Sequence, residues 1–305
     1  MFRLLLPLFF LQLLSIQASA ESIDTLSIRR HLQQLIATEK PRNYRNPEVL
    51  DYVANYIYQE FKQYADTVYY QPYTVQGVTY KNVICTFGSQ HKETIVVGAH
   101  YDVCGDQDGA DDNASGTVGL LELARLLKDK PLQYKIELVA YTLEEPPFFR
   151  TEYMGSYVHA KALKESGQPV YGMISLEMIG YFDDTKGSQE YPVGFLTLLY
   201  GKLGNYITLV NKLHKGKFSR KFSRQFTRQN LIKTKKFNAP AKLPGIDFSD
   251  HLNYWHFGYS ALMITDTAFF RNKNYHKNTD TLETLDLKRM ALTIETVFRT
   301  LIDLS

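Results

Sequence analysis

A short apolar segment that runs into a loop rich in His, Asp and Gly constrains the fold of this chain more than any other feature. Residues 94–99 are TIVVGA, and their β-branched content and short length are typical of a strand that is buried on both faces. The following residues, 100–115, are HYDVCGDQDGADDNAS, and a helical pattern begins near Ser115. In an open α/β sheet, ligands bind at the carboxyl ends of the strands. We therefore expect His100 and Asp102 to lie at a functional edge of a sheet.

Further groups of the same chemical kind follow three other strand-like segments. His100 and Asp112 provide a nitrogen and a carboxylate oxygen, which are ligand types that zinc takes in proteins. The other candidates are Glu144 and Glu145 after residues 133–142, Glu177 at the end of residues 170–177, and Tyr275 and His276 after residues 260–265. Four strand ends that present the same chemistry indicate a metal site.

The ordered motifs HYDV, GADDNASG, LEE, SLEMIGY and YHKNTDT resemble those of the secreted zinc exopeptidase family with two co-catalytic zincs. This family includes bacterial leucyl aminopeptidases and is related to the glutaminyl cyclases. The resemblance covers roughly Tyr80 to the C-terminus, and His100 and Asp112 have a spacing of twelve residues. It implies an α/β fold, namely a three-layer α/β/α sandwich on a mixed, centrally parallel sheet.

The order of the predicted elements favours the same architecture. Strand-like and helical segments alternate from residue 94 to Glu177, which is typical of parallel strands with helices on both faces. Residues 68–75 and 78–87 flank Gln76-Gly77 and predict an antiparallel hairpin at one edge. Helices are predicted over residues 26–38, from Pro47 with Asn46 as its cap, and after Asp286.

The resemblance also implies a role for each site residue. One zinc would be held by His100, Asp112 and Glu177, and the other by Asp112, Glu145 and His276. Asp112 would bridge the two ions, and Asp111 would shape the loop. Glu144 would accept a proton from the water between the ions and return it to the leaving amine. Tyr275 would donate a hydrogen bond to the oxyanion.

Two aspartates are candidates for orienting the histidine ligands. Asp102 is placed to bind the second ring nitrogen of His100, and Asp280 is a similar candidate near His276. The structural alternatives are a strand-end cap for Asp102 and a turn residue for Asp280. His251, Trp255, Phe269, Phe270 and Arg271 are candidates for the wall of the substrate pocket, with a structural role as the alternative for His251 and Trp255. His91, His159 and His214 are expected to be solvated.

The N-terminus predicts export. Arg3, an apolar run over residues 4–14 and the sequence Ala18-Ser19-Ala20 match a secretory signal peptide cleaved after Ala20, and the run is too short to span a bilayer. We expect residues 21–305 to form one domain in the periplasm or outside the cell, without stable membrane insertion. Export permits a disulfide between Cys85 and Cys104, but Cys104 lies several residues beyond the expected cross-strand position, which disfavours the pair. A catalytic cysteine is also disfavoured.

The net charge of +3 conceals a basic segment. Between Tyr191 and Ile246 there are twelve Lys or Arg residues and no acidic residue. Phe218, Phe222 and Phe226 have helical spacing, which predicts a surface helix that packs its Phe face on the core. A patch over residues 212–242 for anionic envelope components or acidic substrates is the alternative. Nucleic acid is a poor partner for an exported chain, and the sequence gives no signal for an oligomeric state.

These features define a leading function and two alternatives. The first is a secreted zinc-dependent aminopeptidase that hydrolyses N-terminal residues of peptides with two zinc ions. The second is a glutaminyl cyclase that forms N-terminal pyroglutamate with a single zinc held by Asp112, Glu145 and His276. The third, a binding module without activity, is disfavoured by the complete ligand set and the Glu144-Glu145 pair. The number of bound metals separates the first two functions.

Overall fold

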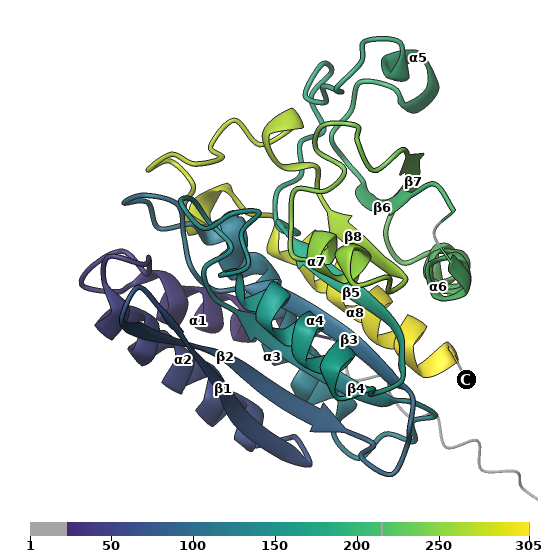
Figure 1. The fold of residues 1–305 in the computed structure, drawn as a ribbon. Helices are drawn as coiled ribbons and strands as arrows, with labels where there is room; N and C mark the ends of the chain where they lie inside the picture. Colours follow the sequence, from purple (N-terminus) through teal and green to yellow (C-terminus); the bar gives the residue numbers. More distant parts are fainter. Residues whose placement is uncertain (1–22, 215, 305) are drawn as a thin grey trace, which may run out of the picture.

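The computed structural model describes residues 23–214 and 216–304, so the predicted signal peptide, residues 1–20, lies outside the described residues. An eight-stranded sheet forms the centre, in the order β1-β2-β4-β3-β5-β8-β6-β7 (Figure 1). The strands are β1 Thr67–Val75, β2 Val78–Phe87, β3 Thr94–His100, β4 Lys135–Tyr141, β5 Val170–Glu177, β6 Ile207–Lys212, β7 Thr234–Ala239 and β8 Ala261–Thr265.

Helices cover both faces of this sheet. They are α1 Thr25–Ile36, α2 Pro47–Lys62, α3 Gly116–Leu127, α4 Gly155–Glu165, α5 Leu196–Tyr200, α6 Gly216–Gln229, α7 His251–His256 and α8 Leu287–Asp303. Neighbouring residues of one strand point to opposite faces, so Val83 and Cys85 join the core under α1, α2, α3, α6 and α8. Ile84 joins the core under α4 and α7 (Figure 1). The predicted three-layer α/β/α sandwich is confirmed.

The middle of the sheet is parallel. β4, β3, β5 and β8 run in the same direction, and every residue of β3 is buried, as its apolar sequence predicts. The hairpin of β1 and β2 lies at one edge, with Val75 paired to Val78 across Gln76-Gly77. Parallel strands end at the same edge, so the residues that follow β3, β4, β5 and β8 meet there.

The basic segment adds two strands that the sequence did not predict. β6 pairs antiparallel with β8, and β7 pairs parallel with β6, so the sheet has an antiparallel pair on this side as well as the two that β2 makes with β1 and β4. The expected mixed sheet with an antiparallel hairpin at one edge is confirmed, and the antiparallel pair of β6 with β8 is an addition that the sequence did not predict. The helix prediction in this segment is confirmed: Phe218, Phe222 and Phe226 of α6 are fully buried.

Capping agrees with the sequence at one helix and not at another. The Asp286 carboxylate accepts a hydrogen bond from the Arg289 N–H and caps α8 as predicted. Asn46 does not cap α2 with its side chain; its amide donates to the Pro41 carbonyl instead.

His159 was expected in solvent but is buried, with Nδ1 at 2.6 Å from the Tyr254 hydroxyl. Among the described residues, no helix combines the length and the apolar character needed to cross a membrane.

Candidate metal centre

The predicted ligands meet at the carboxyl edge of the parallel strands. His100 ends β3, Glu177 ends β5, and Glu144 and Glu145 follow β4. Asp112 lies in the distorted helical turn Ala110–Ser115 that leads into α3, rather than in an open loop, and the peptide bond after it is cis. His276 comes from the loop after β8. His100, Asp112, Glu144, Glu145 and Glu177 are each at most 6% exposed.

Asp112 lies between the two histidines. Its Oδ1 is 3.5 Å from His100 Nε2, and its Oδ2 is 3.2 Å from His276 Nε2. Glu177 Oε2 is 3.5 Å from His100 Nε2, and Glu145 Oε2 is 3.3 Å from His276 Nε2. The structure therefore brings the five predicted ligands together as two groups of three that share one aspartate.

These distances fit a metal better than they fit hydrogen bonds. Tetrahedral zinc ligands about 2.0–2.2 Å from the ion lie about 3.3–3.6 Å from one another, which is close to the spacings observed. Within the described residues, Asp112 Oδ2, Glu145 Oε1 and His276 Nε2 are buried and have no hydrogen-bond partner. Buried polar atoms are almost always paired, so these atoms fit the coordination of a cation. The donor set of imidazole and carboxylate matches zinc.

The electrostatics of the cluster indicate an excess of negative charge. Burial raises the pKa of Glu145 to about 7, and the neighbouring Asp112 carboxylate raises it as well. Burial also raises the pKa of Glu144 well above its usual range, against the effect of His100 and with the help of Glu145. Burial opposes protonation of His100, but the Glu177 and Glu144 carboxylates raise its pKa well above its usual value. A divalent cation would neutralise this repulsion.

Glu144 and Glu145 serve different halves of the site. Glu145 faces His276, whereas Glu144 Oε2 lies 3.9 Å from His100 Nε2. A carboxylate beside the ligands is in position to exchange protons with a molecule bound there. The two carboxylates nevertheless lie close together, because one oxygen of each and a His100 ring nitrogen are within 4.8 Å of one another.

Asp102 holds both glutamates through their backbone. One carboxylate oxygen accepts the N–H of Glu144 and the other accepts that of Glu145, each at 3.2 Å. Its Oδ1 is 3.6 Å from His100 Nδ1, while the Asp102 backbone carbonyl is closer to that nitrogen, at 3.1 Å. The predicted contact with the ring is therefore made chiefly by the carbonyl, and the carboxylate positions residues 144 and 145.

Asp280 holds the backbone of the turn that carries Asp112, as Asp102 holds the backbone of the two glutamates. Its two carboxylate oxygens accept the N–H groups of Asp111 and Asp112, each at 3.0 Å. Of the two roles expected for Asp280, these bonds support that of a turn residue, because both carboxylate oxygens accept from the backbone of the turn. Asp111 fits its predicted role in shaping the loop, since its carboxylate accepts from the Gly180 N–H and the Asn272 amide.

Backbone strain gathers at the same place. Leu143, Met178, Thr267, Ala268 and His276 all have positive φ, between +46° and +91°. Non-glycine residues in this region cost about 1–3 kcal/mol each and persist where the surroundings hold them. Leu143 precedes Glu144, and Met178 follows Glu177, so the strain lies where the chain turns to present its carboxylates.

A cavity of about 190 Å³ opens over the cluster. Besides the site carboxylates, its wall includes Pro146, Phe149, Phe248, Phe269 and Tyr275. Tyr275 stacks on the His276 ring at 3.8 Å, and burial raises its pKa above its usual value. A second, mainly apolar pocket shares Glu177, Phe248 and Phe269 with this cavity and is also lined by Phe270 and Met263.

Three of the proposed pocket residues have structural positions instead. Arg271 is buried beneath the site, where it donates to Gln189 Oε1 and the Tyr181 carbonyl. His251 Nε2 lies 2.8 Å from the Ile246 carbonyl, and its ring packs on Trp255. Burial lowers the pKa of His251 to about 4. Trp255 packs at the core, and its indole N–H donates to the Ala261 carbonyl.

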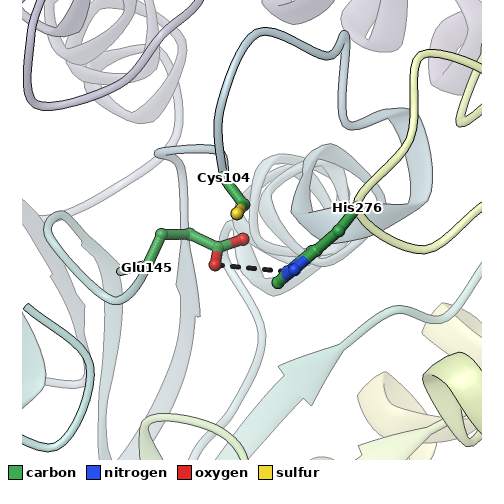
Figure 2. Close-up of side chains that lie close together, drawn as sticks. All are labelled: Cys104, Glu145 and His276. Carbon is green, nitrogen blue, oxygen red and sulfur yellow. Dashed lines mark ion pairs between the residues drawn. The ribbon is translucent and has the colours of Figure 1, made fainter. Parts of the chain in front are cut away.

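Sequence reasoning missed two residues of the site. The Ser249 hydroxyl donates to Glu177 Oε2 at 2.7 Å, and the only signal was its place before Asp250 and His251 in the SDH segment. Cys104 lies beside Glu145 and His276, with the three potential ligand atoms within 4.8 Å of one another (Figure 2). Cys85 and Cys104 are both free, in agreement with the disfavoured disulfide.

The fold and the site define a member of a known peptidase class. Residues 82–301 match the sequence profile of Peptidase family M28, and the chain belongs to this family. The matched range agrees with the resemblance expected from Tyr80 onward. Membership in a peptidase family implies peptide substrates.

Two relatives of known sequence illustrate how similar this chain is to other proteins. YfbL of Escherichia coli K12, an uncharacterized protein, is 41% identical over 278 residues, which are 88% of this chain and 85% of YfbL. Leucine aminopeptidase 1 of Uncinocarpus reesii is 27% identical over 225 residues, 68% of this chain. The chain spans about half, 51%, of the length of that aminopeptidase.

Solved structures share the fold. LapB of Legionella pneumophila has a TM-score of 0.71 and 22% identity, with coverage of 93% of this chain and 73% of LapB. The glutaminyl cyclase of Tannerella forsythia has a TM-score of 0.67 and 20% identity, with coverage of 92% of this chain and 99% of the cyclase. At these identities the likeness establishes the fold alone, so a choice of reaction depends on the site.

Proposed function

We propose that this chain is an exported zinc-dependent aminopeptidase that removes N-terminal residues from peptides. The observation that carries the proposal is the position of Asp112, whose two oxygens face His100 and His276 on opposite sides. Each histidine has a glutamate of its own, Glu177 or Glu145, so the residues offer two complete sets of ligands. A pair of metal ions that share a carboxylate is a common device for hydrolysis.

The proposed chemistry assigns proton transfer to Glu144. Zinc ions, when bound, would acidify water and polarise the carbonyl of the scissile peptide bond. The Glu144 carboxylate accepts the proton of the attacking water and then gives it to the leaving amine. Asp102 accepts the backbone N–H groups of Glu144 and Glu145, and these bonds hold the proposed base, Glu144, at a fixed position relative to the proposed ligand, Glu145. Tyr275 lines the cavity and is a donor to the oxyanion.

The shape of the cavity supports a preference for apolar N-terminal residues. A cavity of about 150 Å³ lined by apolar side chains can hold a ring the size of benzene. The space of about 190 Å³ over the cluster can therefore hold an apolar side chain of this size beside the cluster, and its wall offers Phe149, Phe248 and Phe269 to that side chain. We expect leucyl and phenylalanyl substrates to be hydrolysed faster than aspartyl or lysyl substrates.

A glutaminyl cyclase is the second candidate. It would use a single zinc held by Asp112, Glu145 and His276, and the observation that favours it is that these three residues lie together, with His276 Nε2 at 3.2 Å from Asp112 Oδ2 and 3.3 Å from Glu145 Oε2. His100 and Glu177 favour the peptidase, because they form a second set of ligands that one zinc would leave unused.

The test uses the purified mature protein and a panel of peptides. Leucyl and glutaminyl peptides are compared with the same peptides carrying an acetylated N-terminus, before and after dialysis against a chelator. An aminopeptidase releases the free amino acid from the unblocked peptides only, loses this activity to the chelator and recovers it with zinc. Ammonia release from glutaminyl peptides without hydrolysis would identify a cyclase, and activity that survives metal removal would overturn both functions.

Export is part of the same proposal. The match of residues 1–20 to a signal peptide supports it. Mass spectrometry of the intact protein recovered from the periplasm or the medium should give a mature chain that begins at Glu21. Recovery of the full-length chain in the cytoplasm alone would contradict export without affecting the proposed reaction.

A further inference from the structure

We propose that Cys104 is an additional protein ligand, through Sγ, for the metal held by Asp112, Glu145 and His276. The inference rests on the proposed function, because it assumes that this metal is bound. Figure 2 shows the Cys104 sulfur pointing into the space between the Glu145 carboxylate and the His276 ring. The sulfur, a Glu145 oxygen and a His276 ring nitrogen lie within 4.8 Å of one another.

The neighbours of the sulfur point to a ligand rather than to simple packing. Glu145 is 5% exposed and Asp112 is 2% exposed. Glu145 Oε1 and Asp112 Oδ2 have no hydrogen-bond partner in the part of the chain that the structure describes, and neither does His276 Nε2. Cys104 therefore stands beside Glu145 and His276, whose unpaired buried atoms fit the coordination of a cation, and its sulfur adds a further donor to the same space.

The loop that carries Cys104 is fixed from behind by a buried arginine. Arg42 is 2% exposed, and its guanidinium donates to the backbone carbonyls of Tyr101, Asp108 and Gly109. The Asn43 amide donates to the carbonyl of Gly105, the residue after Cys104. These bonds hold the backbone of residues 101–109, which carries Cys104, against Arg42 and Asn43.

A sulfur ligand would make the two metal positions unequal. Zinc with four protein ligands has no open position, whereas zinc with three protein ligands keeps one for water or substrate. Cys104 would close the position of Asp112, Glu145 and His276, and the position of His100, Asp112 and Glu177 would stay open. Thiolate also favours zinc over magnesium, calcium and manganese. The closed position should then hold zinc more tightly than the open one.

Cobalt(II) provides a readout that does not depend on activity. The chain is loaded with cobalt in place of zinc, and a sulfur ligand gives a charge-transfer band in the near ultraviolet. The Cys104→Ala variant is compared with Cys85→Ala, since Cys85 is the other free cysteine and is buried in β2. We expect the band in the wild type and in Cys85→Ala, and its loss in Cys104→Ala together with a zinc affinity about 10- to 100-fold weaker at one position.

Alkylation keeps the proposal testable if Cys104→Ala does not fold. In the wild-type chain, Cys104 should react with iodoacetamide in the metal-free protein and be protected by zinc, as mass spectrometry of the peptides would show. Metal binding without a sulfur band, or alkylation that zinc does not slow, would overturn the Cys104 ligand and leave the peptidase proposal standing. Failure of the chain to bind any metal would overturn both.

Discussion

Replacing Asp102 by asparagine tests how the site is held in position. In the wild type, its two carboxylate oxygens each accept one backbone N–H, from Glu144 and from Glu145, at 3.2 Å. Asparagine offers one acceptor oxygen and an NH₂ group, so one backbone N–H would face another donor. A hydrogen bond to a charged group contributes about 1.5–3 kcal/mol, and an unpaired buried donor costs about 1–3 kcal/mol.

These costs fall on the segment that carries the proposed base and a proposed ligand. Rearrangement of residues 143–145 would absorb part of them, and we expect the zinc affinity and kcat/KM to fall by about 10- to 100-fold, the range typical for partners of metal ligands. Zinc affinity is measured by competition with a chromogenic chelator, and kcat/KM with a leucyl amide at matched zinc occupancy. Thermal unfolding reports any loss of the fold.

Asp106→Asn is the matched control for this experiment. It makes the same change of charge on the same loop, but Asp106 is exposed and its contact with Arg45, at 4.0 Å, is a weak surface ion pair. We expect wild-type zinc affinity and kcat/KM from it. If Asp102→Asn and Asp106→Asn were indistinguishable in both quantities, the proposed support of Glu144 and Glu145 would be refuted.

Three further changes probe the site and the fold. Ser249→Ala removes the hydrogen bond to Glu177 Oε2 at 2.7 Å, and the loss of about 1.5–3 kcal/mol should weaken zinc binding at least tenfold; unchanged affinity in a competition assay would contradict this. Gly98→Ala would place a Cβ 2.1 Å from the Tyr141 ring and should cost about 1–3 kcal/mol in urea unfolding, whereas Gly194→Ala, with nothing within 4 Å, should cost far less. Burial lowers the pKa of His31 from 6.5 in the unfolded chain to about 4 in the folded protein. As the pH falls, His31 is therefore protonated in the unfolded chain before it is protonated in the folded protein. The folded protein thus loses stability between pH 6.5 and pH 4. When the pH falls from about 7 to about 5, the free energy of unfolding of His31→Gln, measured with urea, should therefore drop by about 1–2 kcal/mol less than that of the wild type. An equal drop in the two proteins would refute the assignment.

The parts of the fold that sequence predicted are those whose pattern comes from burial. β3 is buried throughout and its interior is apolar because helices cover both of its faces, and the Phe face of α6 repeats at helical spacing because it packs on the core. The edge strand β1 was predicted as part of the hairpin, but the other edge strand, β7, was not. β7 alternates little and carries Lys235 and Lys236, since a strand at the edge of a sheet needs no continuous apolar face.

The candidate site divides in a similar way. The sequence could place His100, Asp112, Glu144, Glu145, Glu177 and His276 together, because they follow strands that end at one edge and are of the residue types that bind metals. The bonds that Asp102 and Asp280 make to distant backbone N–H groups could not be predicted, because such bonds follow no pattern in the sequence. Asp280 was placed beside His276 on proximity in sequence, whereas it accepts from Asp111 and Asp112, which lie 169 and 168 residues away.

Cys104 shows the same limit. From sequence it could be weighed only as a partner for Cys85 or as a nucleophile, and its distance from Glu145 and His276 depends on the path of the loop around Arg42. A long-range contact made by a loop produces no periodic pattern in the sequence from which it could be predicted. Ser249 is missed for the same reason, since its bond to Glu177 joins residues 72 positions apart.

The most direct test of the account is the turnover of Glu144→Gln at known zinc content. Glutamine keeps the size of the side chain but cannot accept and return a proton, and general acid–base catalysis contributes about 10²- to 10⁴-fold. The account predicts that kcat on a leucyl amide falls by about 10²-fold or more while the zinc bound per chain equals that of the wild type. Wild-type turnover by the fully loaded variant would contradict it.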